Sequence, residues 1–64
     1  MFTKGDLVYI PQAAILYGLS KLSYFVNKKP ALALFLDYSD KEIGYSTVVM
    51  NGQKWLVKDK DIYL

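Results

Sequence analysis

Hydrophobic and polar residues alternate most regularly near the end of the chain, on either side of an Asn-Gly pair. Residues 43–50 and 53–57 are rich in β-branched and aromatic side chains, and Asn51 and Gly52 stand between them. A two-residue type I′ turn requires positive φ at both central positions, which Asn and Gly tolerate best. The pattern therefore predicts a β-hairpin.

The short turn also fixes which residues of the hairpin lie opposite each other. Counting outward from it, Val48 pairs with Trp55 and Ser46 pairs with Val57. A tryptophan opposite a β-branched residue is a favourable cross-strand pair. We expect Val48, Trp55 and Val57 to point inward, with Trp55 as the anchor of the core.

Three further segments read as strands. Residues 7–10 form a short apolar run that ends at Pro11, because proline cannot donate to a ladder of backbone hydrogen bonds. Residues 31–38 are largely apolar at both alternations, so we expect both faces of this strand to be covered, one of them by the arm. The polar residues 58–61 predict one turn of 3₁₀ helix, and residues 62–64 predict a last strand that pairs with the first.

Residues 12–29 allow two interpretations. One is a helix, because apolar residues recur there at spacings of three and four: Ile15, Leu19, Leu22 and Val26. The other is a long, irregular hairpin arm, because the β-prone triplets 15–17 and 24–26 flank a turn-like segment that begins at Gly18. A glycine in mid-helix is unfavourable, so we favour the arm.

These elements predict an all-β protein in which residues 1–64 form a single domain. Five or six short strands, a long hairpin arm after the first strand and a polar corner before the last describe a small closed barrel. A chain of this length buries only about 60% of its unfolded surface, so its core must be rich. With 53% hydrophobic and 16% aromatic residues, the composition meets that need.

The chain resembles the SH3-like small barrels found among short, uncharacterised bacteriophage proteins. The resemblance covers about two-thirds of the chain, without the arm, and is carried by residues 4–11, Lys29-Pro30, the strand up to Leu36, residues 51–57 and residues 61–63. Proteins of this type often have glycine before the first central strand, where this chain has Ala31-Leu32-Ala33. The resemblance implies an SH3-like barrel and a viral origin, as a virion component or a host-takeover factor.

Composition excludes several kinds of chemistry. The chain has no histidine and no cysteine, which rules out a Ser-His-Asp triad, a Cys-His pair and a zinc site built from these ligands. We therefore expect no enzyme activity, no cofactor and no metal. No apolar run approaches the roughly 20 residues that a membrane helix needs, and no signal peptide is recognisable. We expect a cytoplasmic protein, in the host cytoplasm or the virion if it is viral.

A hydrophobic content this high in so small a domain predicts that some apolar side chains remain exposed, and exposed apolar surfaces usually mark interfaces. We therefore expect a protein partner or self-association into a homo-oligomer. The arm is the predicted contact surface, because its apolar residues show no clear inward alternation. The residues predicted to bind are Tyr17, Leu19, Leu22, Tyr24 and Phe25.

The alternative function is nucleic-acid binding, because lysines beside aromatic residues can hold a single strand by backbone attraction and base stacking. Lys21, Lys28 and Lys29 are the candidate residues. The net charge of +2 gives only a weak field, and the absence of arginine argues against sequence-specific reading of DNA.

The acidic residues are better explained by structure than by catalysis. Asp37, Asp40 and Glu42 predict a solvated hairpin tip, since Lys41 lies among them. Asp59 and Asp61 flank a lysine in the predicted 3₁₀ corner, where we expect them to cap the turn.

Overall fold

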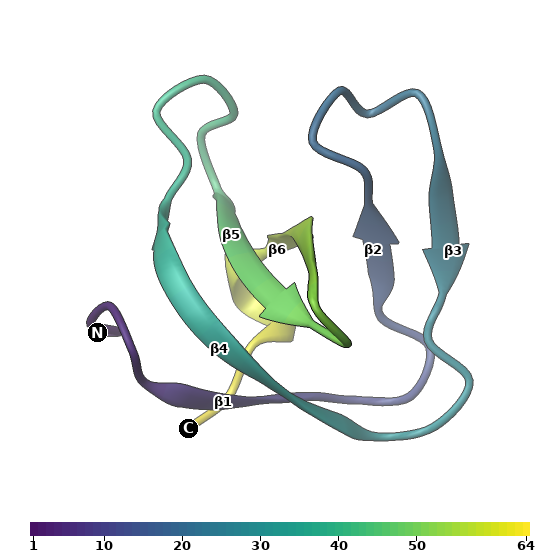
Figure 1. Cartoon of the computed structure of the whole chain (residues 1–64), viewed down its shortest axis with the longest axis horizontal. Helices are drawn as coiled ribbons and strands as arrows, with labels where there is room; N and C mark the ends of the chain where they lie inside the picture. Colours follow the sequence, from purple (N-terminus) through teal and green to yellow (C-terminus); the bar gives the residue numbers. More distant parts are fainter.

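The chain forms six antiparallel strands and one turn of 3₁₀ helix, in a computed structural model that describes all 64 residues (Figure 1). The all-β prediction is therefore confirmed. The strands are β1 (Leu7–Ile10), β2 (Ile15–Tyr17), β3 (Tyr24–Val26), β4 (Ala31–Tyr38), β5 (Tyr45–Met50) and β6 (Gln53–Lys58), and the 3₁₀ turn is η1 (Asp59–Asp61).

All six strands belong to one sheet in the order β1-β4-β5-β6-β2-β3. The sheet curls, and the free edge of β1 meets the end of the chain, where Tyr9 and Tyr63 exchange backbone hydrogen bonds of 2.6 and 3.0 Å. The predicted pairing of the last segment with the first is thus confirmed. It consists of one isolated bridge rather than a strand, which leaves this seam the weakest in the sheet.

The Asn-Gly hairpin forms as predicted. Asn51 and Gly52 have φ angles of 54° and 77°, as a type I′ turn requires. The register is the one counted from the turn, with Val48 opposite Trp55 and Ser46 opposite Val57. Val48 and Val57 are fully buried, and Trp55 is partly buried against the core. The ring of Trp55 therefore closes the rim of the core rather than filling its centre.

Residues 12–29 form the hairpin arm, and the helical interpretation is wrong. β2 and β3 pair in register, and the turn between them is closed by a 2.8 Å hydrogen bond from the Gly18 N–H to the Ser23 carbonyl. β2 also pairs with β6, which makes the arm part of the sheet. β-branched and aromatic residues outweigh the helical spacing here because both strands can bury one face.

The buried side of the sheet forms one core. Its residues alternate along the strands with exposed ones, as the two-residue period of a strand requires. The core consists of Val8, Ile10, Ala14, Leu16, Ala33, Phe35, Val48, Met50, Val57 and Ile62. Phe2, Phe25, Ala31 and Trp55 pack against its rim.

Three sequence expectations need correction. The outer face of β4 is not covered, since Leu32 and Leu34 are exposed. β5 begins at Tyr45 rather than at residue 43, because Gly44, with a φ of 88°, still belongs to the preceding turn. The side chain of Asp59 does not cap η1; its carboxylate accepts a hydrogen bond from the buried hydroxyl of Ser46 instead.

Candidate functional site

The outer side of β1 and β4 carries a group of exposed apolar side chains, which we call the outer apolar face. Leu7 lies opposite Leu34 and Tyr9 lies opposite Leu32, while the bridge to Tyr9 adds Tyr63. Residues directly opposite each other share one face of a sheet. Their exposed fractions are 57% for Leu7, 39% for Tyr9, 61% for Leu32, 44% for Leu34 and 53% for Tyr63.

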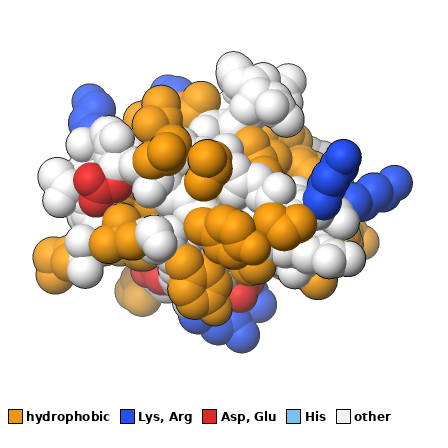
Figure 2. All heavy atoms as spheres, turned by 90° about the horizontal axis from the view of Figure 1, so that it is seen from below, with side chains coloured by type: hydrophobic (Ala, Val, Ile, Leu, Met, Phe, Trp, Pro, Cys, Tyr) orange, Lys and Arg blue, Asp and Glu red, His pale blue; other side chains and the backbone are white.

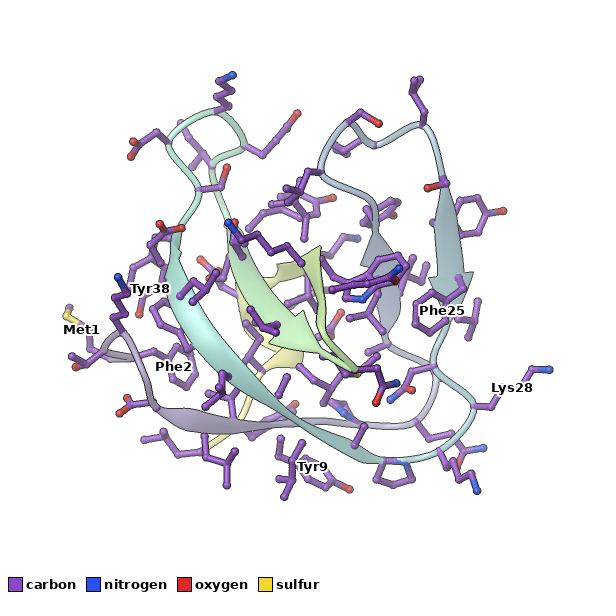
Figure 3. All side chains as sticks on the ribbon, in the orientation of Figure 1. Met1, Phe2, Tyr9, Phe25, Lys28 and Tyr38 are labelled. Carbon is purple, nitrogen blue, oxygen red and sulfur yellow. The ribbon has the colours of Figure 1, made fainter.

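This face follows directly from strand alternation. Val8 and Ile10 in β1, and Ala33 and Phe35 in β4, point inward and are buried. The residues between them must then point outward. No second layer of chain lies over this side, and the ring of Tyr9 projects away from the sheet (Figure 3). Large apolar side chains are therefore held in solvent by the same strands that build the core.

The outer apolar face is also uncharged. Each of its five residues is Leu or Tyr, and Leu34 is followed along the sheet by Val49 of β5. Figure 2, which views the molecule of Figure 1 from below, shows hydrophobic side chains across the middle of this side, with acidic side chains and lysines around them. Contiguous apolar surface with a charged rim is typical of protein interfaces.

The arm does not present its five predicted contact residues together. Tyr17 and Tyr24 lie opposite each other and pack with ring centroids 6.0 Å apart. Phe25 points to the other side of the arm, where its ring meets Trp55 edge-on at 4.8 Å. The two faces of the arm therefore hold separate aromatic groups.

The remaining two predicted contact residues lie in or beside the turn of the arm. Leu19 and Leu22 are both exposed, and Leu22 keeps 90% of its surface in solvent. The exposed apolar residues of the arm are therefore divided between its turn, with Leu19 and Leu22, and β3, with Tyr24 and Val26.

The three lysines of the nucleic-acid alternative are also separated. Lys21 lies at the arm tip, where its ammonium is 3.6 Å from Glu42 and 4.6 Å from the ring centre of Tyr45. Lys28 and Lys29 follow β3, and Lys28 lies at the opposite end of the arm (Figure 3). Because Lys21 already has an anionic and an aromatic neighbour, only Lys28 and Lys29 can act as a pair.

Beside that pair lies an open groove of about 550 Å³ at the base of the arm, which we call the arm groove. Its lining combines apolar residues of three segments with the two lysines and contains no acidic residue. The lining residues are Phe25, Val26, Asn27, Lys28, Lys29, Pro30, Ala31, Met50 and Asn51.

The base of the arm is held by a buried amide. The side-chain Nδ2 of Asn27 donates to the carbonyl oxygens of Ile10 at 3.2 Å and Pro11 at 3.0 Å. The backbone of Asn27 adds a donated hydrogen bond to Ala14 and an accepted one from Ala13, each 2.8 Å. These four hydrogen bonds fix the end of β3, and hence one wall of the arm groove, against the end of β1 and the connection that follows it.

The carboxylates do not converge. No group of three or more acidic side chains comes close enough to hold a metal ion. Glu42 faces Lys21, and Asp59 accepts from Ser46. Glu42 and Asp59 therefore have structural partners across a loop and a strand.

Comparison with models of protein families, with curated proteins and with solved structures yields no match for this chain. No helix of the structure has the length and apolar character needed to cross a membrane. Function is therefore inferred from the exposed side chains themselves.

Sequence reasoning missed the outer apolar face and the arm groove. The signal for the face was present, because residues 31–38 are apolar at both alternations and a 64-residue chain cannot cover two faces of every strand. Most of the groove lining is the continuous run 25–31, and the sheet topology adds Met50 and Asn51, which no local pattern places beside that run.

Proposed function

We propose that this protein is a non-enzymatic binding module that acts through protein–protein interaction, and that the outer apolar face is its contact surface for self-association. The exposed cross-strand pairs Leu7–Leu34 and Tyr9–Leu32 are the observation that carries the proposal. Leaving such side chains in water forgoes the favourable free energy of burying them, about 25 cal/mol per Å². A partner that covers the face recovers it.

A second copy of the chain is the partner that suits this face best. The face carries no charge, so a twofold axis through it brings no like charges together. Its leucines and tyrosines can pack against the same residues of another copy, which is the self-complementarity that a symmetric dimer needs. Tyrosine is also enriched at protein interfaces, because its ring buries a large area while its hydroxyl stays hydrated.

The absence of His and Cys supports a non-enzymatic role. If the resemblance to short bacteriophage proteins holds, the module is a virion component or a host-takeover factor that works in the host cytoplasm or the particle. That family and origin remain predictions.

Sedimentation equilibrium across a wide range of protein concentration tests the proposal. We expect a reversible dimer that Leu32→Glu converts to a monomer, because the new carboxylate would have to be buried at the interface. Leu22→Glu is the matched control, since it places the same charge on an exposed leucine at the arm tip and should leave the dimer intact. A wild-type protein that stays monomeric would refute self-association. Loss of the dimer in Leu22→Glu alone would move the contact surface to the arm.

A further inference from the structure

A second binding feature is the unpaired edge of β3. β3 is the last strand of the sheet and pairs only with β2. The hydrogen bonds between Gly18 and Ser23 and between Asn27 and Ala14 fix which pairs of the hairpin are hydrogen-bonded. Such pairs alternate in an antiparallel ladder. The backbone N–H and C=O groups of Tyr24 and Val26 therefore point away from β2, toward the open side.

The arm groove continues from this edge. Phe25 and Val26 belong both to β3 and to the groove lining, and the groove then follows the chain to Ala31 at the start of β4. An extended chain lying along β3 would place a side chain opposite Phe25 on the same side as that ring. There it would reach Met50 across the groove. Backbone donors and acceptors and an apolar recess are thus arranged side by side, as in domains that bind peptides by strand addition.

Charge identifies the kind of chain that fits. Lys28 and Lys29 both line the groove, both are exposed and no acidic residue lines it. Neither lysine has a salt-bridge partner in the protein, unlike Lys21. An incoming segment with carboxylates at that end would supply the missing partners.

We propose that the edge of β3 and the arm groove bind an extended, acidic segment of a partner protein, which joins the sheet as an additional antiparallel strand. β3 runs from Tyr24 toward Lys28, so an antiparallel segment enters at the lysines. Its acidic residues therefore precede its apolar ones. This site is separate from the outer apolar face and does not depend on self-association.

Two other occupants fit less well. A second copy of β3 would bring no carboxylate to the lysines, because residues 23–30 contain no acidic residue. A nucleic acid strand could use the two lysines but not the backbone groups of Tyr24 and Val26, which match another polypeptide strand. The chain also lacks arginine, the residue that stacks on bases and forms bidentate hydrogen bonds with phosphate.

Fluorescence anisotropy with a fluorescein-labelled peptide, Glu-Glu-Val-Thr-Val-Thr-Val, tests the proposal. We expect saturable binding that weakens about tenfold in the Lys28→Glu/Lys29→Glu double variant, since two attractions become repulsions. The matched control is Lys4→Glu/Lys60→Glu, which makes the same change in net charge on exposed residues outside the groove and should bind as the wild type does.

A second variant tests the strand edge itself. Val26→Pro removes one outward N–H without breaking a hydrogen bond to β2, so the fold should persist while peptide binding weakens about fivefold. Val26→Thr keeps the N–H and should bind normally. The fluorescence of Trp55, which packs against Phe25, reports whether the arm is intact in each variant.

The outcomes separate clearly. Absence of peptide binding up to about 1 mM, or binding that neither Val26→Pro nor the double lysine variant weakens, would overturn the proposal. Tighter binding of a labelled oligothymidine than of the peptide would overturn it in favour of nucleic acid. The charge-reversed variants should still dimerise. Failure of the peptide-binding proposal is therefore distinguishable from failure of the proposal that the outer apolar face mediates self-association.

Discussion

Replacing Asn27 by alanine should loosen the arm more than any other single polar substitution. Asn27 is only 6% exposed, and its amide group ties the end of β3 to the carbonyl oxygens of Ile10 and Pro11. Asn27→Ala removes both of these hydrogen bonds but keeps the two that the backbone makes with Ala13 and Ala14. The change therefore isolates the contribution of the side chain.

The expected loss of stability follows from the two hydrogen bonds that the carbonyl oxygens of Ile10 and Pro11 no longer accept. A net contribution of about 1 kcal/mol per hydrogen bond gives about 2 kcal/mol, and a carbonyl left without a partner in a buried region raises the cost. Ile10 is fully buried, so its oxygen cannot readily turn to water. We expect a loss of about 2–3 kcal/mol, out of a total stability of about 3–10 kcal/mol for a domain of this size. The melting temperature should fall by about 10–20 °C.

Urea denaturation followed by the fluorescence of Trp55 measures this loss, because Trp55 is the sole tryptophan and lies against the arm through Phe25. Gln12→Ala is the matched control, since it deletes an exposed amide from the β1–β2 connection to which Asn27 bonds, and it should change stability by less than about 0.5 kcal/mol. If Asn27→Ala costs no more than Gln12→Ala, the amide does not hold the arm and the account of the groove wall is wrong.

Two other substitutions probe the backbone and the corner. Ala13 has a φ of 75°, a conformation that costs a residue with a Cβ about 1 kcal/mol. Ala13→Gly should therefore leave stability unchanged or raise it by up to about 1 kcal/mol, whereas Ala14→Gly at the next, buried position should lower it by about 1 kcal/mol or more in the same urea titration. Equal losses of stability in both variants would contradict the backbone strain at Ala13. Ser46→Ala should destabilise the protein by about 1–2 kcal/mol, because the buried hydroxyl donates a hydrogen bond to the carboxylate of Asp59. The control Ser20→Ala, on the exposed arm tip, should have little effect on stability. A Ser46→Ala variant as stable as the wild type would show that the hydrogen bond adds nothing to stability.

Local sequence signals predicted the strands well. The Asn51–Gly52 turn fixed its hairpin residue by residue, because only a few residue types accept its φ angles. The triplets at 15–17 and 24–26 became β2 and β3 although the same residues also carry a helical spacing. Tertiary pairing decided between the two, since β2 gains β6 as a neighbour and a helix would not.

The binding surfaces were harder to predict, because they depend on which strands pair and on which face of the sheet each side chain lies. The outer apolar face joins Leu7 and Tyr9 to Leu32 and Leu34 through the β1–β4 register. No property of residues 7–10 alone says that the neighbouring strand will present leucines on the same side. The arm residues were singled out for their apolar content, yet strand alternation divides Tyr17 and Tyr24 from Phe25.

The pairing of Tyr9 with Tyr63 has a consequence for how the molecule is assembled. The β2–β3, β4–β5 and β5–β6 hairpins join residues close in sequence and can form early in folding. The Tyr9–Tyr63 bridge instead joins residues separated by almost the whole chain. Contacts between such distant residues form slowly, because a long loop must close before they are gained. The seam between Tyr9 and Tyr63 should therefore be among the last contacts made during folding and the first to open. Brief opening at the β1 edge would then be the route by which backbone amide protons of the native protein exchange with solvent and by which a protease gains access to the chain.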